Sequence, residues 1–176
     1  LMSKMPNKKI AITGTIGSGK STVTKYIAKQ LPTISSDEIV DQLYCDKNFI
    51  KQVNKLIYNS NSDRLDKRHL AETIFHDKRA KEKLEALIHP LVKIEIETFM
   101  NKQEGIVFAE VPLLYEANFV SMFDEVILVV ADEDIIIERL IENRGYTKEE
   151  AVARINNQFS VAYKIKHADI VLYNNG

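Results

Sequence analysis

The sequence predicts an α/β fold in which helices flank a parallel sheet. First, residues 14–21 fit the pattern G-x-x-x-x-G-K-[ST] directly after an apolar stretch at 10–12, which indicates a strand, a glycine-rich loop and a helix. Second, residues 106–109 and 126–130 are continuous apolar runs rich in β-branched side chains, a pattern typical of parallel strands buried on both faces. Helical segments separate these strands, so right-handed crossovers around one sheet are expected.

The first third of the chain contains two expected strands and two expected helices. A strand at 9–13 precedes the loop, and a helix follows from about 19 to 31, where Pro32 ends it because proline has no backbone N–H. A second strand at 33–35 ends at Ser36 and Asp37, and helical spacing resumes over 38–44. Asp37 therefore stands at the end of a strand, as the N-cap of that helix, as a ligand-facing carboxylate, or as both.

The segment from about 46 to 102 contains no convincing strand and is predicted to be a helical insertion. Pro90 lies inside its second apolar series and disfavours the helical conformation of His89, so we expect a break or a kink there. The apolar residues at helical spacing are Phe49, Val53, Leu56 and Ile57, then Leu84, Leu87, Ile88, Leu91, Ile94 and Phe99.

The last third is expected to alternate strands and helices again. After the strand at 126–130, Asp132 is placed to cap a helix that runs through about Asn143, and Gly145 suits the position just past its end. Residues 147–150, Thr-Lys-Glu-Glu, have the order of a capping box and open another helix. A short strand at 169–172 is the last predicted element.

Composition mainly excludes classes of protein. A chain of 176 residues with 45% hydrophobic residues and a net charge of −1 fits one compact unit with an inserted subdomain, and it has no global field for nucleic acid or an anionic membrane. No apolar run approaches the roughly 18 residues that span a bilayer. Residues 1–9 lack the apolar segment of a signal peptide, and we leave the first few out of the fold. The single cysteine, Cys45, is expected to be a small buried residue in a cytoplasmic protein. We expect a monomer or a weak homo-oligomer.

The loop at 14–21 predicts a binding site for nucleotide phosphates. Backbone N–H groups in such a loop point at an anion, the Lys20 ammonium reaches the β- and γ-phosphates, and the Ser21 hydroxyl can ligate Mg²⁺. The alternative is a glycine-rich turn without a ligand. The residues expected to bind ATP here are Gly14, Thr15, Ile16, Gly17, Ser18, Gly19, Lys20, Ser21 and Thr22.

Three more charged residues are candidates for catalysis. Asp37 follows a strand that is expected to lie next to the strand before the loop, at the edge where α/β sheets bind ligands. Its carboxylate can accept a hydrogen bond from an acceptor hydroxyl or hold a water of Mg²⁺. Arg139 and Arg144 lie about 140° apart on an unbroken helix. Because Gly145 is expected to end that helix, the two guanidinium groups can converge as in a lid over a triphosphate. Their alternative role is a solvated helix face.

Four further residues are weaker candidates for a role in catalysis. Glu110 follows a buried strand and either orients a water of Mg²⁺ or is a plain strand-end carboxylate. Asp132 and Glu133 resemble the acidic pair of a motor ATPase, but a helix cap is the favoured role of Asp132. His89 is favoured as a packed residue at a helix break over a catalytic base.

A set of segments stands in a fixed order and spacing along the chain: 12–21, 34–40, 87–90 (Leu-Ile-His-Pro), 111–116 (Val-Pro-Leu-Leu-Tyr-Glu), Arg139 with Arg144, Gln158, 168–169 and 174–176. In this order and spacing they resemble the dephospho-coenzyme A kinase family, over about residues 9–176. Many members of that family carry an acidic residue where Ser35 stands and a glycine where Thr15 stands, and the family usually continues past the position of Gly176 into another helix.

This resemblance implies transfer of the γ-phosphoryl group of ATP to the ribose 3′-hydroxyl of dephospho-coenzyme A, the last step of coenzyme A synthesis. It implies that Asp37 is the catalytic carboxylate and holds Mg²⁺ together with Ser21. It implies that Arg139 and Arg144 belong to a lid at 139–157, and that the segment from Asn174 through Asn175 to Gly176 lies near the adenine. Segments 8–45 and 104–176 would form the nucleotide-binding core, and 46–103 the substrate domain.

Two alternative functions are weighed against this one. A GTPase switch needs D-x-x-G and N-K-x-D, but Lys102, Glu142 and Tyr173 stand three residues before the later glycines. The Asn-Lys pairs at 54–55 and at 101–102 are not followed by aspartate at the required spacing. A different small-molecule kinase is the closer alternative, because the fold and the loop alone permit it.

Overall fold

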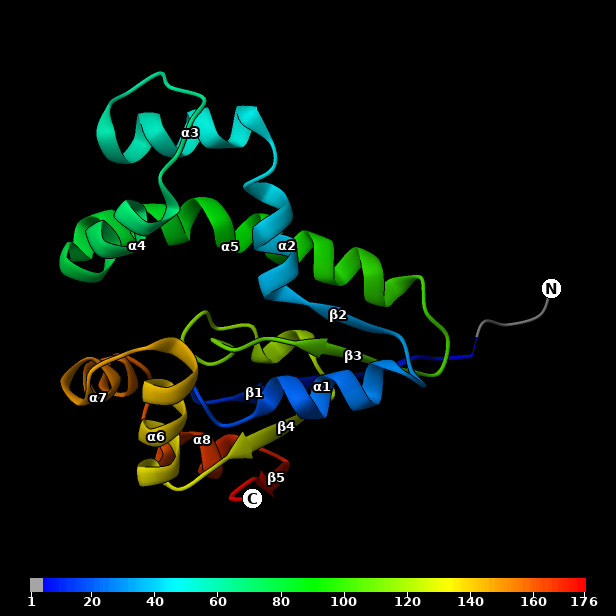
Figure 1. The fold of residues 1–176 in the computed structure, drawn as a ribbon. Coiled ribbons are helices and arrows are strands. Elements are labelled where there is room, and N and C mark those ends of the chain that lie inside the picture. Colours follow the sequence, from blue (N-terminus) through cyan, green and yellow to red (C-terminus); the bar gives the residue numbers. More distant parts are fainter. Residues whose placement is uncertain (1–4) are drawn as a thin grey trace. The chain divides into compact units, whose positions relative to one another are not determined.

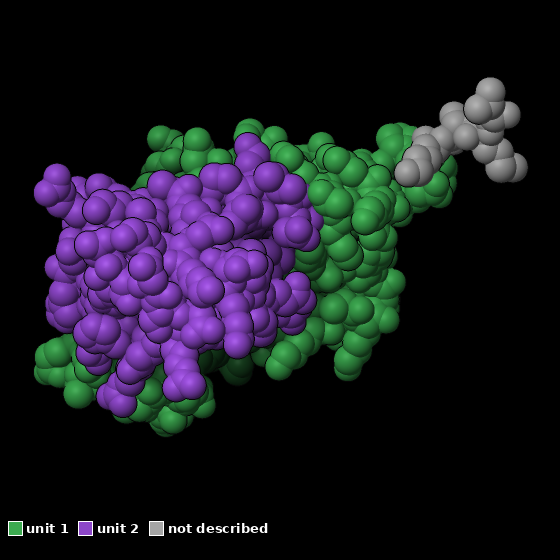
Figure 2. All heavy atoms as spheres, turned by 90° about the horizontal axis from the view of Figure 1, so that it is seen from above, with its two compact units in different colours: residues 1–36, 97–176 green, residues 37–96 purple. Residues whose placement is uncertain are grey.

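The computed structural model describes residues 5–176, which form two compact units (Figures 1 and 2). The first unit contains the described chain up to Ser36 and the segment from Glu97 to Gly176, and the second contains the segment from Asp37 to Ile96. Residues 1–4, which the sequence analysis leaves out of the fold, lie outside the described residues. The second unit begins directly after the second strand.

The first unit is built on a parallel sheet, as the sequence predicts. Within residues 5–176 the strand order is β2-β3-β1-β4-β5, and all neighbouring strands are parallel. Because the strands are parallel, their C-terminal ends share one edge, which is where open α/β sheets bind ligands. The strands are β1 (Lys8–Gly14), β2 (Thr33–Ser35), β3 (Ile106–Glu110), β4 (Glu125–Val130) and β5 (Ile170–Tyr173).

Helix α1 (Lys20–Ala28) covers one face of this sheet (Figure 1). Its side chains Val23 and Ile27 pack against a buried cluster that β1, β3 and β4 supply together. Burial of such apolar area is the main stabilising term for the unit. The helix ends at Ala28, earlier than the predicted Leu31, and residues 29–31 continue as hydrogen-bonded turns before Pro32. The sheet side chains in this cluster are Ile10, Ile12, Phe108 and Val129.

The remaining helices of the first unit confirm most of the local predictions. Gly145 adopts a φ of 67° at the end of α6 (Glu133–Arg144), and Thr147 with Glu150 forms the capping box of α7 (Lys148–Asn156). Asp132 stands at the N-cap of α6, but its side chain makes no capping hydrogen bond, so that part of the prediction is wrong. Helix α8 (Val161–His167) and the 3₁₀ turn η1 (Val120–Met122) are too short to show a periodic pattern and were not predicted.

The second unit is helical, as predicted, with most of α2 (Ser36–Leu43), all of α3 (Lys47–Tyr58) and α4 (Lys67–His76), and the larger part of α5 (Lys78–Asn101). Its core contains Phe49, Val53, Leu70 and Leu84. Cys45, expected to be buried, is exposed after α2. Among residues 5–176, no helix combines the length and the apolar composition that crossing a membrane requires.

The predicted break at Pro90 does not occur, because α5 runs continuously from Lys78 to Asn101. Proline in a helix interior removes one hydrogen bond and costs about 3 kcal/mol. Packing on both sides of Pro90 offsets this cost, since Leu87, Ile88 and Leu91 contact the core of the second unit.

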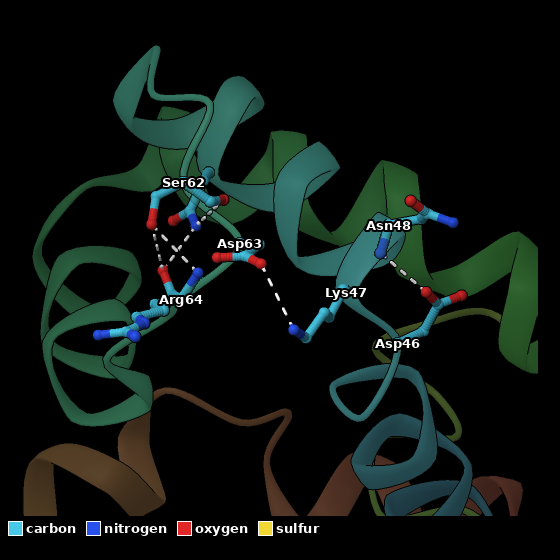
Figure 3. Close-up of polar contacts among 7 residues, drawn as sticks. Asp46, Lys47, Asn48, Ser62, Asp63 and Arg64 are labelled. Atoms are coloured by element: carbon cyan, nitrogen blue, oxygen red, sulfur yellow. Dashed lines mark hydrogen bonds and ion pairs between the residues drawn. The ribbon is translucent and has the colours of Figure 1, made fainter.

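A buried amide organises the loop between α3 and α4 (Figure 3). Asn54 is 4% exposed, and its Nδ2 donates to the carbonyl oxygens of Ser62 at 2.9 Å and Arg64 at 2.8 Å. Ser62 Oγ in turn accepts from the Arg64 N–H at 3.1 Å. Lys47 and Asp63 form an exposed ion pair at 3.6 Å across the same region, which adds little stability.

Asn54→Ala is expected to lower the free energy of unfolding by about 1–3 kcal/mol, because both carbonyl groups lose a buried donor. Urea denaturation followed by far-ultraviolet circular dichroism measures this change. Asn48→Ala is the matched control, since Asn48 lies on the same helix with an exposed side chain (Figure 3). Equal urea concentrations at the unfolding midpoints of the two variants would contradict the role of Asn54.

Candidate active site

The glycine-rich loop lies between β1 and α1, and close packing dictates two of its glycines. A Cβ on Gly14 would lie 2.5 Å from the carbonyl oxygen of Val129 on β4, far inside van der Waals contact. Gly19 has a φ of 83°, and a Cβ there would overlap the side-chain amide of Asn174, just past β5. Both positions therefore require glycine, and the loop backbone is held close to β4 and to the segment after β5.

The loop ends at the N-terminus of α1, with Gly19 as the N-cap and Lys20 as the first helical residue. Backbone N–H groups at this end of a helix, together with the helix dipole, favour a bound anion. Ser21 and Thr22 are exposed in the first turn, where their hydroxyl groups are accessible. The motif residues from Gly14 to Thr22 thus form one continuous segment that ends in the first turn of α1.

Two hydroxyl groups of the loop are buried without a hydrogen-bond partner. Thr15 and Ser18 are 2% and 1% exposed, and neither hydroxyl has a partner within the described part of the chain. A buried polar group without a partner is unfavourable, and such groups in native proteins commonly have a functional explanation.

Glu110 lies beside the loop lysine. Its Oε1 is 3.9 Å from Lys20 Nζ, and both side chains are nearly buried, with exposed fractions of 10% and 13%. Glu110 stands at the end of β3 in register with Ile12 of β1, so it projects from the sheet face that α1 covers. The carboxylate therefore holds the ammonium group near the end of the loop.

The side chains of Arg139 and Asn174 donate hydrogen bonds to carbonyl oxygens of the loop. Arg139 Nη1 donates to the Gly17 carbonyl oxygen at 3.3 Å, and Asn174 Nδ2 donates to the Ser18 carbonyl oxygen at 3.1 Å. Arg139 Nη2 also donates to the carbonyl oxygen of Asn174 at 2.9 Å. These donors fix the orientation of the Gly17 and Ser18 carbonyl groups, and in a trans peptide the N–H of the following residue points the opposite way.

The other predicted residues of the C-terminal third lie apart from these contacts. Arg144 is the last residue of α6, is exposed, and makes no ion pair or hydrogen bond with the rest of the described chain. The predicted convergence of Arg144 with Arg139 therefore stays a prediction. Asn175 Oδ1 accepts from the Asp132 N–H at 2.8 Å, which ties the segment after β5 to the start of α6. Gly176 is exposed.

Asp37 is the first residue of the second unit and lies in the first turn of α2. Because the helix already begins at Ser36, Asp37 is inside it, and the predicted N-cap role is wrong. The carboxylate is exposed, and it follows β2 by two residues. An acidic side chain in the first turn of a helix interacts favourably with the helix dipole.

A buried ion pair joins α8 to the segment that follows β3. Lys164 on α8 is fully buried, and its Nζ lies 3.2 Å from Oε2 of Glu116. The same Oε2 accepts from the backbone N–H of Phe159 at 3.2 Å. Removing one member of a buried pair leaves the other charge without compensation, which commonly costs about 3–5 kcal/mol.

Tyr115 is buried next to this pair, with its ring edge-on to Tyr163 at a centroid distance of 5.9 Å. Burial raises the pKa of Tyr115 to about 12, and the nearby charges of Asp169, Tyr163 and Glu116 add to this shift. The unfolded chain ionises this phenol near pH 10, so the unfolded state gains stability relative to the folded state as the pH rises from about 10 to about 12. The stabilising contribution of the neutral Tyr115 phenol is complete below about pH 10 and is lost as the pH rises through about 12.

Tyr115→Phe is therefore expected to reduce the alkaline loss of stability by about 1 kcal/mol near pH 11. Near pH 8 we expect little change, since the Tyr115 hydroxyl has no hydrogen-bond partner in the described residues. Denaturant unfolding of the wild type and the variant at both pH values tests this. Tyr173→Phe is the control, because Tyr173 is 69% exposed. A pH dependence identical to that of the wild type would contradict the prediction.

Known proteins with similar sequences indicate the family of this chain. The sequence profile of the dephospho-CoA kinase family matches residues 8–176. The chain is 34% identical to the dephospho-CoA kinase of Geobacillus kaustophilus, over 95% of this chain and 88% of that protein. It is 38% identical to the dephospho-CoA kinase of Lactobacillus johnsonii, over 95% and 89%. The chain belongs to the dephospho-CoA kinase family.

Solved structures agree with this family assignment in their fold. TT1252 from Thermus thermophilus is 32% identical and superposes with a TM-score of 0.85, covering 97% of this chain and 90% of that one. A shikimate kinase from Bacteroides thetaiotaomicron is 19% identical with a TM-score of 0.55, over 93% and 84% of the two chains, and shares the fold alone. The dephospho-CoA kinase chain described here therefore has the fold of a P-loop kinase, as predicted.

The sequence predicted the loop of this dephospho-CoA kinase family member between a strand and a helix, but not the contact of Asn174 with that loop. Asn174 was expected near the adenine, Glu116 was noted only inside a segment that resembles the family, and Lys164 was not noted. Their partners lie far away along the chain, as with Lys164 and Glu116. A fully buried lysine has no local signature in a single sequence, because only the fold brings its carboxylate to it.

Proposed function

We propose that this chain transfers the γ-phosphoryl group of ATP to the ribose 3′-hydroxyl of dephospho-coenzyme A. Membership of the dephospho-CoA kinase family supports this reaction. The observation that carries the proposal is the loop itself, whose backbone ends at a helix N-terminus with Lys20 held 3.9 Å from the buried Glu110. A loop with this geometry and an ammonium group at its end fits the phosphates of a nucleoside triphosphate.

In this proposal the phosphates lie over the loop amides and the ammonium group of Lys20. Phosphoryl transfer passes through a loose transition state, so positioning and neutralisation of charge supply most of the catalysis. Lys20 supplies the charge, and Glu110 keeps it at the end of the loop.

We assign Asp37 the role of accepting the proton of the ribose 3′-hydroxyl. A bond forms between that oxygen and the γ-phosphorus as the bond from the γ-phosphorus to its bridging oxygen breaks, and ADP leaves. The position of Asp37, directly after β2 and exposed in the first turn of α2, supports this assignment. A positioned carboxylate of this kind typically contributes about 10²–10⁴-fold to the rate.

The side chains available for Mg²⁺ are Ser21 and Asp37. Both offer oxygen ligands, which Mg²⁺ prefers, and kinase sites usually supply only one or two protein ligands beside phosphates and waters. When bound, Mg²⁺ neutralises charge on the β- and γ-phosphates.

The remaining assignments concern larger segments. We assign the nucleotide to a core of residues 8–45 and 104–176, with Asn175 and Gly176 near the adenine, and dephospho-coenzyme A to a substrate domain at 46–103. Arg139 and the exposed Arg144 belong to a lid at 139–157 that excludes water, which would otherwise take the phosphoryl group. We place the reaction in the cytoplasm, where an exposed free thiol such as Cys45 stays reduced.

One assay tests this function. The purified protein is incubated with ATP and Mg²⁺ and one acceptor at a time: dephospho-coenzyme A, shikimate, a nucleoside monophosphate, or none. ADP release is followed by a coupled assay, and the product is identified by mass. We expect turnover only with dephospho-coenzyme A. Faster turnover with another acceptor would favour a different small-molecule kinase, and no turnover with any acceptor would overturn the proposal.

A further inference from the structure

Gln158 makes a contact with the phosphate-binding loop that the proposed mechanism does not use. Its side-chain Oε1 accepts a hydrogen bond from the backbone N–H of Ile16 at 3.1 Å. Gln158 is half-buried and lies just past the end of α7, so a residue from the C-terminal third of the chain contacts the middle of the loop.

We propose that Gln158 is a positioning residue that fixes the conformation of the nucleotide-binding loop before the nucleotide arrives. This inference rests on the proposed nucleotide-binding function and names a residue on which the affinity for phosphates depends. Gln158 touches no reacting atom in the proposal, and it acts through the backbone of Ile16.

The geometry of one peptide group carries the argument. The Ile16 N–H and the Thr15 carbonyl belong to the same planar peptide, and in a trans peptide they point in opposite directions. The N–H is bound by Gln158, and the Thr15 carbonyl accepts from the Ser18 N–H at 3.1 Å. Gln158 therefore fixes the orientation of a peptide whose other end closes the turn that carries Gly17 and Ser18.

Contacts on both sides fix Gln158 itself. Its backbone N–H donates to the Ile155 carbonyl oxygen at 3.2 Å, at the end of α7. The next residue, Phe159, donates its N–H to Glu116 Oε2, which lies 3.2 Å from the buried Lys164. The ion pair thus attaches the segment after α7 to the segment after β3, and Gln158 extends from that fixed backbone to the loop.

This arrangement complements the contacts of Arg139 and Asn174. Those two side chains donate to the loop carbonyl oxygens of Gly17 and Ser18, whereas Gln158 accepts from a loop N–H. The three contacts fix three of the four peptide groups between Thr15 and Gly19, so this part of the loop needs little reorganisation on binding. Pre-organisation of this kind raises affinity by lowering the entropy cost of binding.

The test compares three variants by calorimetric titration with ADP and Mg²⁺. Gln158→Leu removes the acceptor at nearly constant size, and we expect the Kd for ADP to rise about five- to tenfold, the effect of one lost hydrogen bond. Gln158→Glu keeps an acceptor, and at about 1 M salt, where its added charge is screened, its Kd is expected to stay near that of the wild type. Asn157→Ala is the matched control, since Asn157 is the exposed neighbouring residue.

Two further readouts separate positioning from a general loss of structure. In steady-state assays Gln158→Leu is expected to raise the KM for ATP and to leave the KM for dephospho-coenzyme A unchanged. Amide hydrogen exchange of Ile16, measured by NMR, is expected to be slow in the wild type and in Gln158→Glu and faster in Gln158→Leu. If Gln158→Leu fails to fold, fast exchange of the Ile16 amide in the wild type still overturns the inference.

The outcomes also distinguish this inference from the proposed function. Absence of ADP binding by the wild type would overturn the nucleotide-binding function itself. Binding by the wild type together with an unchanged Kd in a folded Gln158→Leu protein would overturn only the role of Gln158.

Discussion

Alanine in place of Lys20 is expected to lower kcat by at least about a hundredfold, with ATP and dephospho-coenzyme A both saturating. Lys20 is the charged group at the end of the loop, 13% exposed and held beside Glu110. In a nearly buried position an ammonium group stabilises developing negative charge far more than it does in water, because the local dielectric constant is lower. A coupled assay of ADP release measures the change.

The control is Lys25→Ala, since Lys25 lies on the same helix with an exposed side chain. Loss of Lys20 also removes the ammonium group beside the buried Glu110, so stability is expected to fall together with activity. The double variant Lys20→Met with Glu110→Gln separates these effects, because it removes both charges. It should recover thermal stability without recovering kcat. A Lys20→Ala enzyme with near-normal kcat would contradict the assigned role.

Features that depend on a few neighbouring residues were predictable from the sequence. The glycine-rich loop, the capping box at Thr147 and the left-handed Gly145 all satisfy backbone requirements within a few residues, and the structure has each of them. The parallel strands were predictable because burial on both faces demands continuous apolar residues, as in β4.

Features that depend on the tertiary structure were not predictable. The break at Pro90 was expected because proline disfavours helix, and the packing that outweighs this preference comes from α3 and α4. The contact of Gln158 with Ile16 joins residues 142 positions apart, and the pair of Lys164 with Glu116 links two separate elements. No spacing rule within a single sequence reports such contacts.

Asp37 combines a feature that was predictable from the sequence with one that was not. Its place after a strand followed from the apolar pattern, and β2 does end at Ser35. The prediction that this strand neighbours β1 was wrong, because β3 lies between the two strands. The predicted N-cap role of Asp37 was wrong, because α2 begins one residue earlier, at Ser36, and includes Asp37 in its first turn. This shift strengthens the functional interpretation, since a residue inside the first turn is not needed as the N-cap.

Asp37→Asn is accordingly expected to lower kcat by about 10²–10⁴-fold, the range for a positioned general base, while the protein stays folded. Asparagine keeps the shape of the side chain and removes its charge and its ability to accept the proton of the ribose hydroxyl. Asp37 is exposed, so no core packing is lost. Asp41→Asn on the same helix is the control, because Asp41 is exposed and its only ion pair among the described residues, with Lys67 at 3.7 Å, is worth little.

A titration with Mg²⁺ distinguishes the two roles proposed for Asp37. If its carboxylate mainly holds the metal, the Asn variant needs a higher Mg²⁺ concentration and then recovers most of its kcat, since Ser21 and the phosphates still supply oxygen ligands. If the carboxylate mainly accepts the proton, kcat stays low at every Mg²⁺ concentration, because no added cation replaces a base. An Asn variant with the kcat of the wild type at ordinary Mg²⁺ concentrations would exclude both roles and would direct the search for the base to Glu110, the nearly buried carboxylate at the end of β3.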